Sequence, residues 1–339
     1  MKRNRTFRQR MALSAIGLLF LSVSIHAETK SKVGTTVYPF LEIGVGARAA
    51  GLGEAYTARA TNATGLFWNP AGIALGSNEL TFDHTQWFAS LNYNFVGLIV
   101  KMGSAGSVGL SLTSFNSGLI DVTTALRPEG TGQNYELSDI AMGVTYARQL
   151  TDRFSIGGSV KYIHSSLWDM TTSAMAFDIG TLFHSPLLGI TIGMSISNFG
   201  NSVRYSGANT IVRHDIDPIH SGNNDKILAN LRTNEWELPL IFRFGLAREF
   251  GFGPVGNIVC SLDALHPNNN VESLNMGIEY DFRKMIFLRA GYKAFGIQDS
   301  EEGLTFGGGI GYRILKLDYS YSDFGLLGNT QRFSFSLVF

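Results

Sequence analysis

Strict alternation of apolar and polar side chains over residues 331–339 constrains the fold more than any other feature of the sequence. One face of this stretch carries bulky apolar side chains, namely Phe333, Phe335, Leu337 and Phe339. A period of two is that of a β-strand, and a soluble protein rarely leaves such a strand at a free sheet edge because an unpaired apolar edge promotes aggregation. We therefore expect this strand to pair with the first strand of its sheet and close a β-barrel. A strand of a soluble β-sandwich is the alternative.

Further segments after residue 79 have the length and composition of strands. We expect fourteen in all, at about 80–88, 91–102, 106–115, 137–149, 153–167, 173–184, 188–199, 236–250, 255–264, 273–282, 286–295, 303–313, 315–322 and 331–339. In a bilayer, the apolar residues of a barrel strand must face outward and the small or polar residues inward. The sequence therefore predicts an all-β, transmembrane antiparallel barrel of about fourteen strands, residues 80–339.

The expected connections differ in length in a way that agrees with this topology. Those after even-numbered strands are short, whereas the two longest connections, 116–136 and 200–235, follow odd-numbered strands. Outer-membrane barrels have short turns on the periplasmic side and longer loops outside. We therefore expect both long connections on the external side of the bacterial outer membrane.

Composition argues against several other classes of protein. No apolar run of about eighteen residues follows the first thirty residues, so a transmembrane helix is not expected. Without residues 1–27 the chain has 22 Lys and Arg against 27 Asp and Glu, an acidic balance that argues against nucleic-acid binding. The single cysteine, Cys260, excludes an internal disulfide. The sequence has no G-x-S-x-G elbow, and neither an enzymatic activity nor a cofactor is expected.

Residues 1–27 have the three parts of a secretory signal peptide. Basic residues lie between Lys2 and Arg10, an apolar stretch follows from Met11 to Val23, and Ala27 offers a cleavage site. We expect this peptide to be removed on export.

The segment 28–79 does not alternate and is rich in small residues. We expect a short helix within 47–60 and a turn at Asn69-Pro70. Side chains alone do not fill a barrel of fourteen strands, so we expect this segment to lie in the lumen as a hatch. A phosphate-binding loop is the alternative, but the glycine spacing is not GxGxxG.

Three stretches of this segment, 40–49, 51–58 and 67–72, resemble the N-terminal signature of the PorV/PorQ family of outer-membrane proteins. The matching hatch motif comprises Gly44, Gly46, Arg48, Trp68, Asn69, Pro70 and Gly72. The resemblance implies a barrel similar in architecture to the long-chain fatty-acid transporters. It also implies a role in type IX secretion, in which the barrel binds the C-terminal signal domain of exported proteins, contacts other secretion subunits, and passes its cargo to attachment or release. Residues 60–63 depart from the family pattern, in which an Asp pair is expected.

The two long connections contain aliphatic residues suited to a hydrophobic partner. They are Leu119, Ile120, Val122, Leu126, Ile211, Val212, Ile216 and Ile219. The partner is either a protein domain or a small hydrophobic compound such as a fatty acid, and the family resemblance favours the protein.

Other polar groups are weaker candidates for a site. The loop 214–220 contains two His and two Asp residues that could bind a cation, although a plain polar loop has the same composition. Arg243, Arg289, Lys293 and Arg313 are expected on the lumen side, where they either form a polar pocket or pair with carboxylates. Aromatic residues near strand ends, Trp87, Phe88 and Trp168, are expected at the membrane interface.

Overall fold

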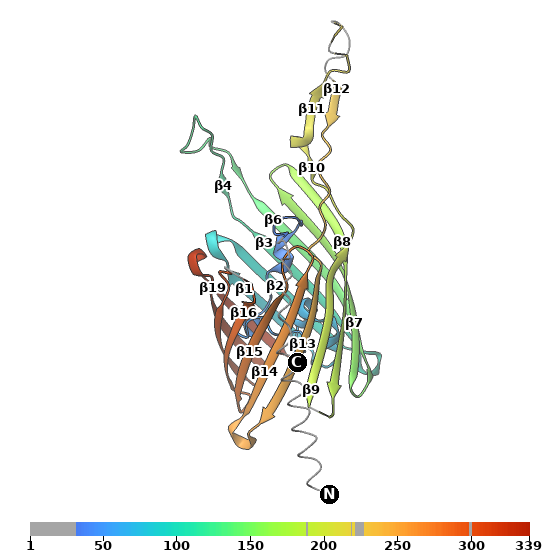
Figure 1. The fold of residues 1–339 in the computed structure, drawn as a ribbon, viewed down its shortest axis with the longest axis vertical. Helices are drawn as coiled ribbons and strands as arrows, with labels where there is room; N and C mark the ends of the chain where they lie inside the picture. Colours follow the sequence, from blue (N-terminus) through green and yellow to red (C-terminus); the bar gives the residue numbers. More distant parts are fainter. Residues whose placement is uncertain (1–31, 188, 218, 221–226, 298–299) are drawn as a thin grey trace. The chain divides into compact units, whose positions relative to one another are not determined.

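A closed antiparallel barrel forms most of the structure (Figure 1). The computed structural model describes residues 32–187, 189–217, 219–220, 227–297 and 300–339, and the expected signal peptide lies outside these residues. Within them, fourteen strands make up the barrel. They are β1 (Glu79–Gln86), β2 (Asn92–Lys101), β3 (Ser107–Asn116), β6 (Leu137–Thr151), β7 (Phe154–Leu167), β8 (Met170–Ser185), β9 (Ile190–Gly200), β13 (Ile241–Gly251), β14 (Asn257–Pro267), β15 (Ser273–Phe282), β16 (Ile286–Phe295), β17 (Leu304–Tyr312), β18 (Leu315–Asp323) and β19 (Asn329–Val338).

The barrel closes through its last strand, as the sequence predicts. β19 pairs with β1 from Glu79 opposite Val338 to Gln86 opposite Gln331, and it pairs with β18 on its other side. Phe333 points outward and is 53% exposed, whereas Arg332 points inward and is buried. The predicted alternation therefore separates the lipid face from the lumen face.

Each predicted strand has a counterpart in the barrel, and the largest boundary error is at β13. This strand was expected from residue 236 but begins at Ile241. Pro239 lacks the N–H group that a ladder needs, and its carbonyl instead accepts a hydrogen bond from the Asn198 side chain at 2.9 Å. The residues before Ile241 therefore belong to the long connection rather than to the strand.

Both long connections contain short strands that the sequence did not predict. We call residues 117–136 the first long loop and residues 201–240 the second long loop. The additional strands are β4 (Ile120–Asp121) and β5 (Asn134–Tyr135) in the first, and β10 (Ser206–Gly207), β11 (Ile211–His214) and β12 (Ile227–Asn230) in the second. β4 pairs with β5 and β11 with β12, and both hairpins extend beyond the same rim of the barrel (Figure 1).

Residues 36–76, which we call the inner segment, lie inside the barrel (Figure 1). This segment is built from turns and short helices, namely η1 (Pro39–Glu42), α2 (Ala47–Ala50), α3 (Gly65–Trp68) and η2 (Pro70–Ala74). The helix expected within 47–60 ends at Ala50 because Gly53 and Glu54 adopt positive φ angles of 62° and 63°, which reverse the chain. None of the described helices is long and apolar enough to cross a membrane.

Single 3-10 turns lie in several of the connections between strands. They are η3 (Phe88–Ser90), η4 (Gly103–Ala105), η5 (Ala208–Thr210), η6 (Gly253–Val255) and η7 (Gly325–Leu327). η4 and η6 occupy the rim opposite the long loops, where the short connections predicted from the sequence are found.

Candidate functional site

The first long loop is an ordered hairpin with exposed aliphatic side chains. Val122 is half-buried, its N–H donates to the Gln133 carbonyl at 2.9 Å, and its carbonyl accepts from the Thr131 N–H at 2.8 Å. Leu126 at the tip is 94% exposed, and Leu119 and Ile120 are exposed at the base. The loop therefore presents apolar side chains to solvent on a hydrogen-bonded frame.

The second long loop is a longer hairpin with the same character. Ile211, Ile216 and Ile219 are exposed, and Val212 is half-buried. Leu228 and Leu231, which were not predicted as site residues, are also exposed and lie in or next to β12. Both residues could have been recognised as aliphatic side chains in a polar stretch of the sequence. Neither belongs to the alternating pattern of a barrel strand.

The base of the second long loop is fixed to the barrel. Val203 and Trp236 exchange two backbone hydrogen bonds of 3.0 and 2.9 Å, and Arg204 forms an ion pair with Glu235. The Tyr205 hydroxyl lies 3.0 Å from the Ser165 hydroxyl on β7. A polar cleft of about 490 Å³ lies between this base and the first residues of β8. The hairpin therefore stands on an ordered stem.

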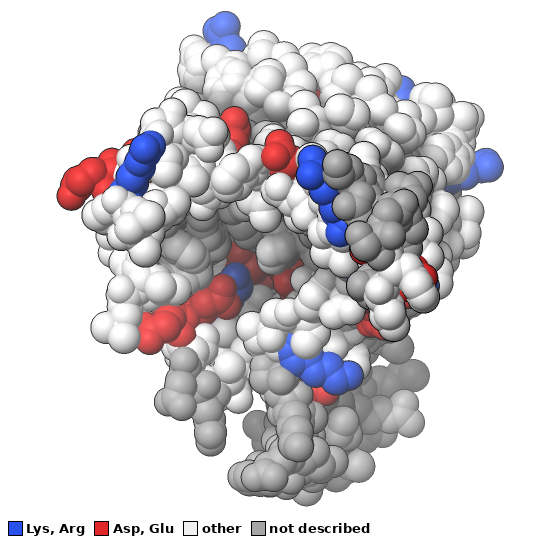
Figure 2. All heavy atoms as spheres, turned by 90° about the horizontal axis from the view of Figure 1, so that it is seen from above, with Lys and Arg blue, Asp and Glu red and all other residues white. Residues whose placement is uncertain are grey.

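The face that carries the long loops is hollowed at its centre, and acidic side chains gather in and beside the hollow (Figure 2). Lys293, near the long-loop end of β16, forms ion pairs with Glu54 at 3.1 Å and with Glu302 at 2.7 Å. At the same end of the inner segment, the Asn269 side chain donates to Glu42 at 3.1 Å. Burial raises the pKa of the Glu42 carboxyl, and this hydrogen bond opposes the rise.

Glycines of the barrel wall let the inner segment approach closely, in places backbone to backbone. Wall glycines whose added Cβ would meet the inner segment are Gly97, Gly109, Gly157, Gly180, Gly193, Gly245, Gly277, Gly291 and Gly307. A Cβ at Gly157 on β7 would lie 2.6 Å from the Pro70 carbonyl, and one at Gly291 on β16 would lie 2.1 Å from the Gly53 nitrogen. Since these contacts occur on opposite halves of the strand order, the inner segment fits the lumen closely.

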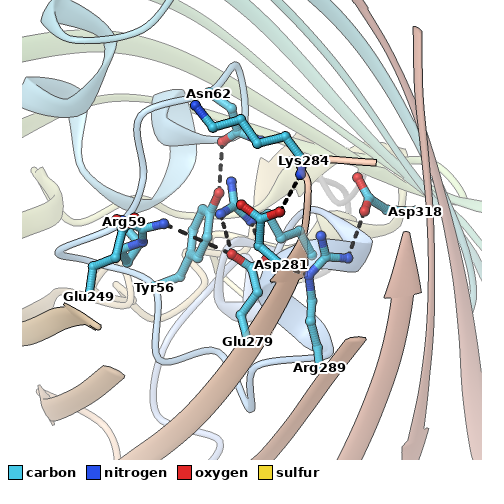
Figure 3. A network of polar contacts seen from close by, with 10 residues as sticks. Tyr56, Arg59, Asn62, Glu249, Glu279, Asp281, Lys284, Arg289 and Asp318 are labelled. Atoms are coloured by element: carbon cyan, nitrogen blue, oxygen red, sulfur yellow. Dashed lines mark hydrogen bonds and ion pairs between the residues drawn. The ribbon is translucent and has the colours of Figure 1, made fainter. Parts of the chain in front are cut away.

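A buried ion-pair network ties the inner segment to β15 and its neighbours (Figure 3). Glu279 of β15 accepts two hydrogen bonds from Arg48, at 2.6 and 2.9 Å, and one from Arg289 at 2.7 Å. Arg289 also donates to Asp318 at 2.6 Å, and Arg59 approaches Glu249 at 3.5 Å. Arg48, from the predicted hatch motif, therefore binds the wall through a bidentate pair, the strongest geometry for an Arg and a carboxylate.

Hydrogen bonds fix the inner segment to other parts of the wall as well. Asp263 of β14 accepts from the backbone N–H groups of Tyr56 and Thr57 at 2.9 and 2.8 Å. The Ala47 N–H donates to Ser334 of β19 at 2.7 Å, and the Asn69 side chain donates to the Thr181 carbonyl of β8 at 3.0 Å. Hydrogen bonds therefore anchor the inner segment to β8, β14 and β19 as well as to β15.

The remaining residues of the predicted hatch motif pack within the inner segment. The Trp68 indole donates to the Val45 carbonyl at 2.8 Å, and Gly46 adopts a φ of 90°. Gly44 packs against the Trp68 ring, Pro70 begins η2, and a Cβ at Gly72 would lie 1.8 Å from the Ala60 carbonyl. Within 60–63, where the sequence departs from the family pattern, Asn62 accepts hydrogen bonds from Tyr56 and Thr64.

One of the expected lumen residues lies elsewhere. Arg243 and Arg289 are buried inside the barrel and Lys293 is paired, as described, but Arg313 is exposed in the turn after β17. The expectation for Arg313 was wrong because β17 ends at Tyr312 and the chain reverses at the positive φ of Arg313, 53°.

The other weak candidates also have definite positions. Among the described residues no three His, Cys, Asp or Glu side chains are placed to hold a metal ion, and in the loop 214–220 His220 pairs with Asp217 at 2.7 Å. Pro218 lies outside the described residues. Trp87 packs against Phe88 and Phe324, and Trp168 stacks on Tyr135.

Comparison with known proteins gives a family match and a fold match. The family model described as "Type IX secretion system protein PorV" matches residues 26–210, more than half of the 339 residues. No curated protein matches the sequence.

Several solved structures have a similar fold. The toluene transporter TbuX of Ralstonia pickettii has a TM-score of 0.55 and 11% identity, over 87% of this chain and 98% of that chain. The toluene transporter TodX of Pseudomonas putida has a TM-score of 0.54 and 13% identity, over 87% and 96%. A Pseudomonas aeruginosa FadL homologue has a TM-score of 0.50 and 12% identity, over 85% and 97%. At these identities the likeness shows the fold alone.

Proposed function

Because this chain belongs to the PorV family of type IX secretion system proteins, we propose that its two long loops bind the C-terminal signal domain of exported proteins and pass these proteins to attachment or release. The family and the closed barrel place the chain in the bacterial outer membrane. The outward apolar side chains then contact lipid, and the long loops lie on the cell surface, as is usual for such barrels.

The close fit of the inner segment in the lumen is the observation that carries this proposal. A compound that crosses the barrel needs a passage, and the inner segment meets wall backbone at Gly157 and at Gly291 without room for a methyl group. Its anchors at Glu279 and Asp263 would have to break before a passage opened. The surfaces open to a partner are therefore those outside the lumen.

The long loops offer a suitable surface for a protein. A stable protein interface covers roughly 800 Å² on each partner, and two hairpins that extend from one rim supply more area than a single pocket would. Solvent-exposed aliphatic patches of this kind mark binding sites on soluble surfaces. Leu126 and Ile219 lie on different hairpins, so a partner that contacts both must span the rim, as a folded domain can.

Transport of a small hydrophobic compound is the second candidate function. It is favoured by the fold shared with the toluene transporters, and by that alone. In that function the inner segment would rearrange to admit the compound, and the long loops would collect it. We also propose that the barrel contacts other secretion subunits, which it could do in either function.

The experiment compares exposed residues that differ only in the loop that carries them. Leu126→Asp and Ile219→Asp, combined in one full-length variant, place charges on both hairpins. Leu326→Asp is the matched control, because Leu326 is 93% exposed but lies in η7, between β18 and β19. Each protein is reconstituted in lipid nanodiscs, and binding of a purified C-terminal signal domain is measured.

We expect the double variant to bind at least tenfold more weakly, because a buried Leu or Ile contributes about 1.5–3 kcal/mol and about 1.4 kcal/mol is tenfold. The Leu326→Asp protein should bind like the wild type. Equal binding by all three proteins would refute the role of the long loops, and uptake of a labelled fatty acid would then test the transport alternative.

A further inference from the structure

The outward wall of the barrel has a large apolar hollow. It has a volume of about 840 Å³ and spans β16, β17, β18, β19, β1 and β2. Large outward side chains surround it, among them Phe82, Val96, Leu288, Leu317 and Phe335. A barrel is ordinarily convex toward lipid, so a hollow across six neighbouring strands needs a cause.

Part of the cause is a missing side chain in the middle of the wall. Gly308 lies on the outward face of β17, directly opposite Leu288 on β16 and Tyr319 on β18. Its two neighbours on the same face, Phe306 and Ile310, are large and exposed. Gly308 therefore leaves a gap in an otherwise bulky row.

The inner segment also contributes to the hollow, because it binds the same strands from inside the barrel and keeps them close to itself. A Cβ at Gly51, just after α2, would lie 3.0 Å from the Cα of Gly307 on β17. The Ala47 N–H donates to Ser334 on β19 at 2.7 Å, and the Gly53 N–H donates to Thr305 on β17 at 3.0 Å. Small residues on both sides of this contact let the wall approach the inner segment, which leaves the outward face hollow.

The hollow has a polar group at one end. His84 of β1 points outward, and its Nδ1 lies 2.7 Å from the Asn94 side-chain oxygen on β2. His84 is near the long-loop end of β1, which ends at Gln86, whereas Ile286 at the other end of the hollow begins β16 at the opposite rim. The lining thus changes from polar near the cell surface to apolar deeper in the membrane.

This arrangement matches one class of occupant. The hollow is continuous with the outward apolar band of a barrel in the outer membrane, so the molecules that reach it are membrane lipids. A lipid of the outer leaflet has its headgroup near the surface and its acyl chains deeper, in the same order as His84 and the apolar lining. We propose that the hollow binds an acyl chain of one outer-leaflet lipid, whose headgroup oxygens contact His84 and Asn94, and that the inner segment maintains the shape of this site.

The test uses full-length protein extracted in mild detergent and analysed by native mass spectrometry. Gly308→Leu fills the hollow from outside, and it should fold because an added Cβ meets no atom closer than 3.8 Å. Ile278→Phe is the control, since Ile278 also faces lipid, is exposed, and does not line the hollow. The wild type and the control should retain one lipid, and Gly308→Leu should lose it.

Two further variants separate the parts of the proposal. His84→Ala should reduce retention several-fold without changing the fold. Thr305→Val removes the bond from the Gly53 N–H and alters no residue that lines the hollow, so a reduced lipid mass in that variant supports shaping by the inner segment. Heat-modifiable migration in gels confirms a folded barrel in each case.

Several results would overturn the inference. If the wild-type protein retains no lipid, or only detergent, the proposed lipid site does not exist. If Gly308→Leu retains as much lipid as the wild type, the lipid binds outside the hollow. A copurified membrane protein that crosslinks at Phe333 in place of lipid would identify a different occupant. Unchanged retention in Thr305→Val would remove the role of the inner segment.

Discussion

Replacement of Glu279 by alanine tests whether the buried ion-pair network holds the inner segment in the barrel. The Glu279 side chain is only 2% exposed and accepts hydrogen bonds from Arg48 and Arg289. In Glu279→Ala, Arg289 keeps Asp318 at 2.6 Å, whereas Arg48 loses both of its bonds to the wall. Removal of one partner of a buried ion pair costs about 3–5 kcal/mol. We expect a loss near the lower bound, because the Arg48 side chain is 21% exposed and can recruit water.

The matched control is Glu272→Ala. Glu272 pairs with His266 at 3.0 Å, but both side chains are more than half exposed, and such surface pairs contribute about 0–1 kcal/mol. The assay is the denaturant dependence of unfolding in detergent, followed by heat-modifiable migration and tryptophan fluorescence, since Trp68 lies in the inner segment. A shift in Glu279→Ala no larger than that in Glu272→Ala would refute the view that this network anchors the inner segment.

A double-mutant cycle with Arg48→Ala makes the test more specific. Arg48→Ala leaves Glu279 paired with Arg289, so it should destabilise the protein less than Glu279→Ala does. The combined variant should be more stable than the sum of the two losses predicts, by about 0.5–3 kcal/mol, as expected for residues in contact. Additive losses would mean that the two side chains act independently.

Three further predictions follow from the wall and the lumen. Deletion of residues 331–339 removes most of β19 and leaves β1 and β18 as open edges. It should abolish membrane insertion and heat-modifiable migration, and a truncated protein that still inserts and resists proteolysis would contradict closure of the barrel by β19. The intact protein should show low conductance in planar bilayers, and removal of residues 32–78 should produce large openings; a large steady conductance with the segment present would indicate an open pore. Gly291→Leu should displace the inner segment and raise conductance, because its side chain collides with Gly53, whereas outward Gly308→Leu should not.

The barrel could be predicted from the sequence because its determinant is local. Alternation in a stretch such as 190–197 reports directly which side chains face lipid, and each strand repeats this signal independently. Closure followed from the same rule, since Phe333 and Phe335 needed a lipid-facing strand with partners on both sides. The lumen position of the inner segment followed from volume, which depends only on strand number.

The conformation of the inner segment could not be predicted in the same way. Its contacts are distant in sequence, as for Arg48 with Glu279, so local propensity did not determine where helices end. The expected helix within 47–60 ended at Gly53 and Glu54, whose positive φ angles depend on the surrounding wall. Arg313 was misplaced for a simpler reason: a boundary error of one residue moves a side chain from a strand into a turn.

The energetics of opening the lumen favour a partner that binds outside it. Displacement of the inner segment would break the Arg48–Glu279 pair, at up to about 3 kcal/mol because Glu279 keeps Arg289, and the two backbone bonds to Asp263, at roughly 1 kcal/mol each. A ligand shifts a closed state to an open one only by its differential affinity for the two, and a complete shift needs about 5.5 kcal/mol even from a 1:99 equilibrium. A small hydrophobic compound that binds with micromolar affinity gains about 8 kcal/mol in total, and most of that gain would be used to open the lumen. Binding at Leu126 and Ile219 requires no such opening, and we therefore expect the long loops to act while the inner segment stays in place.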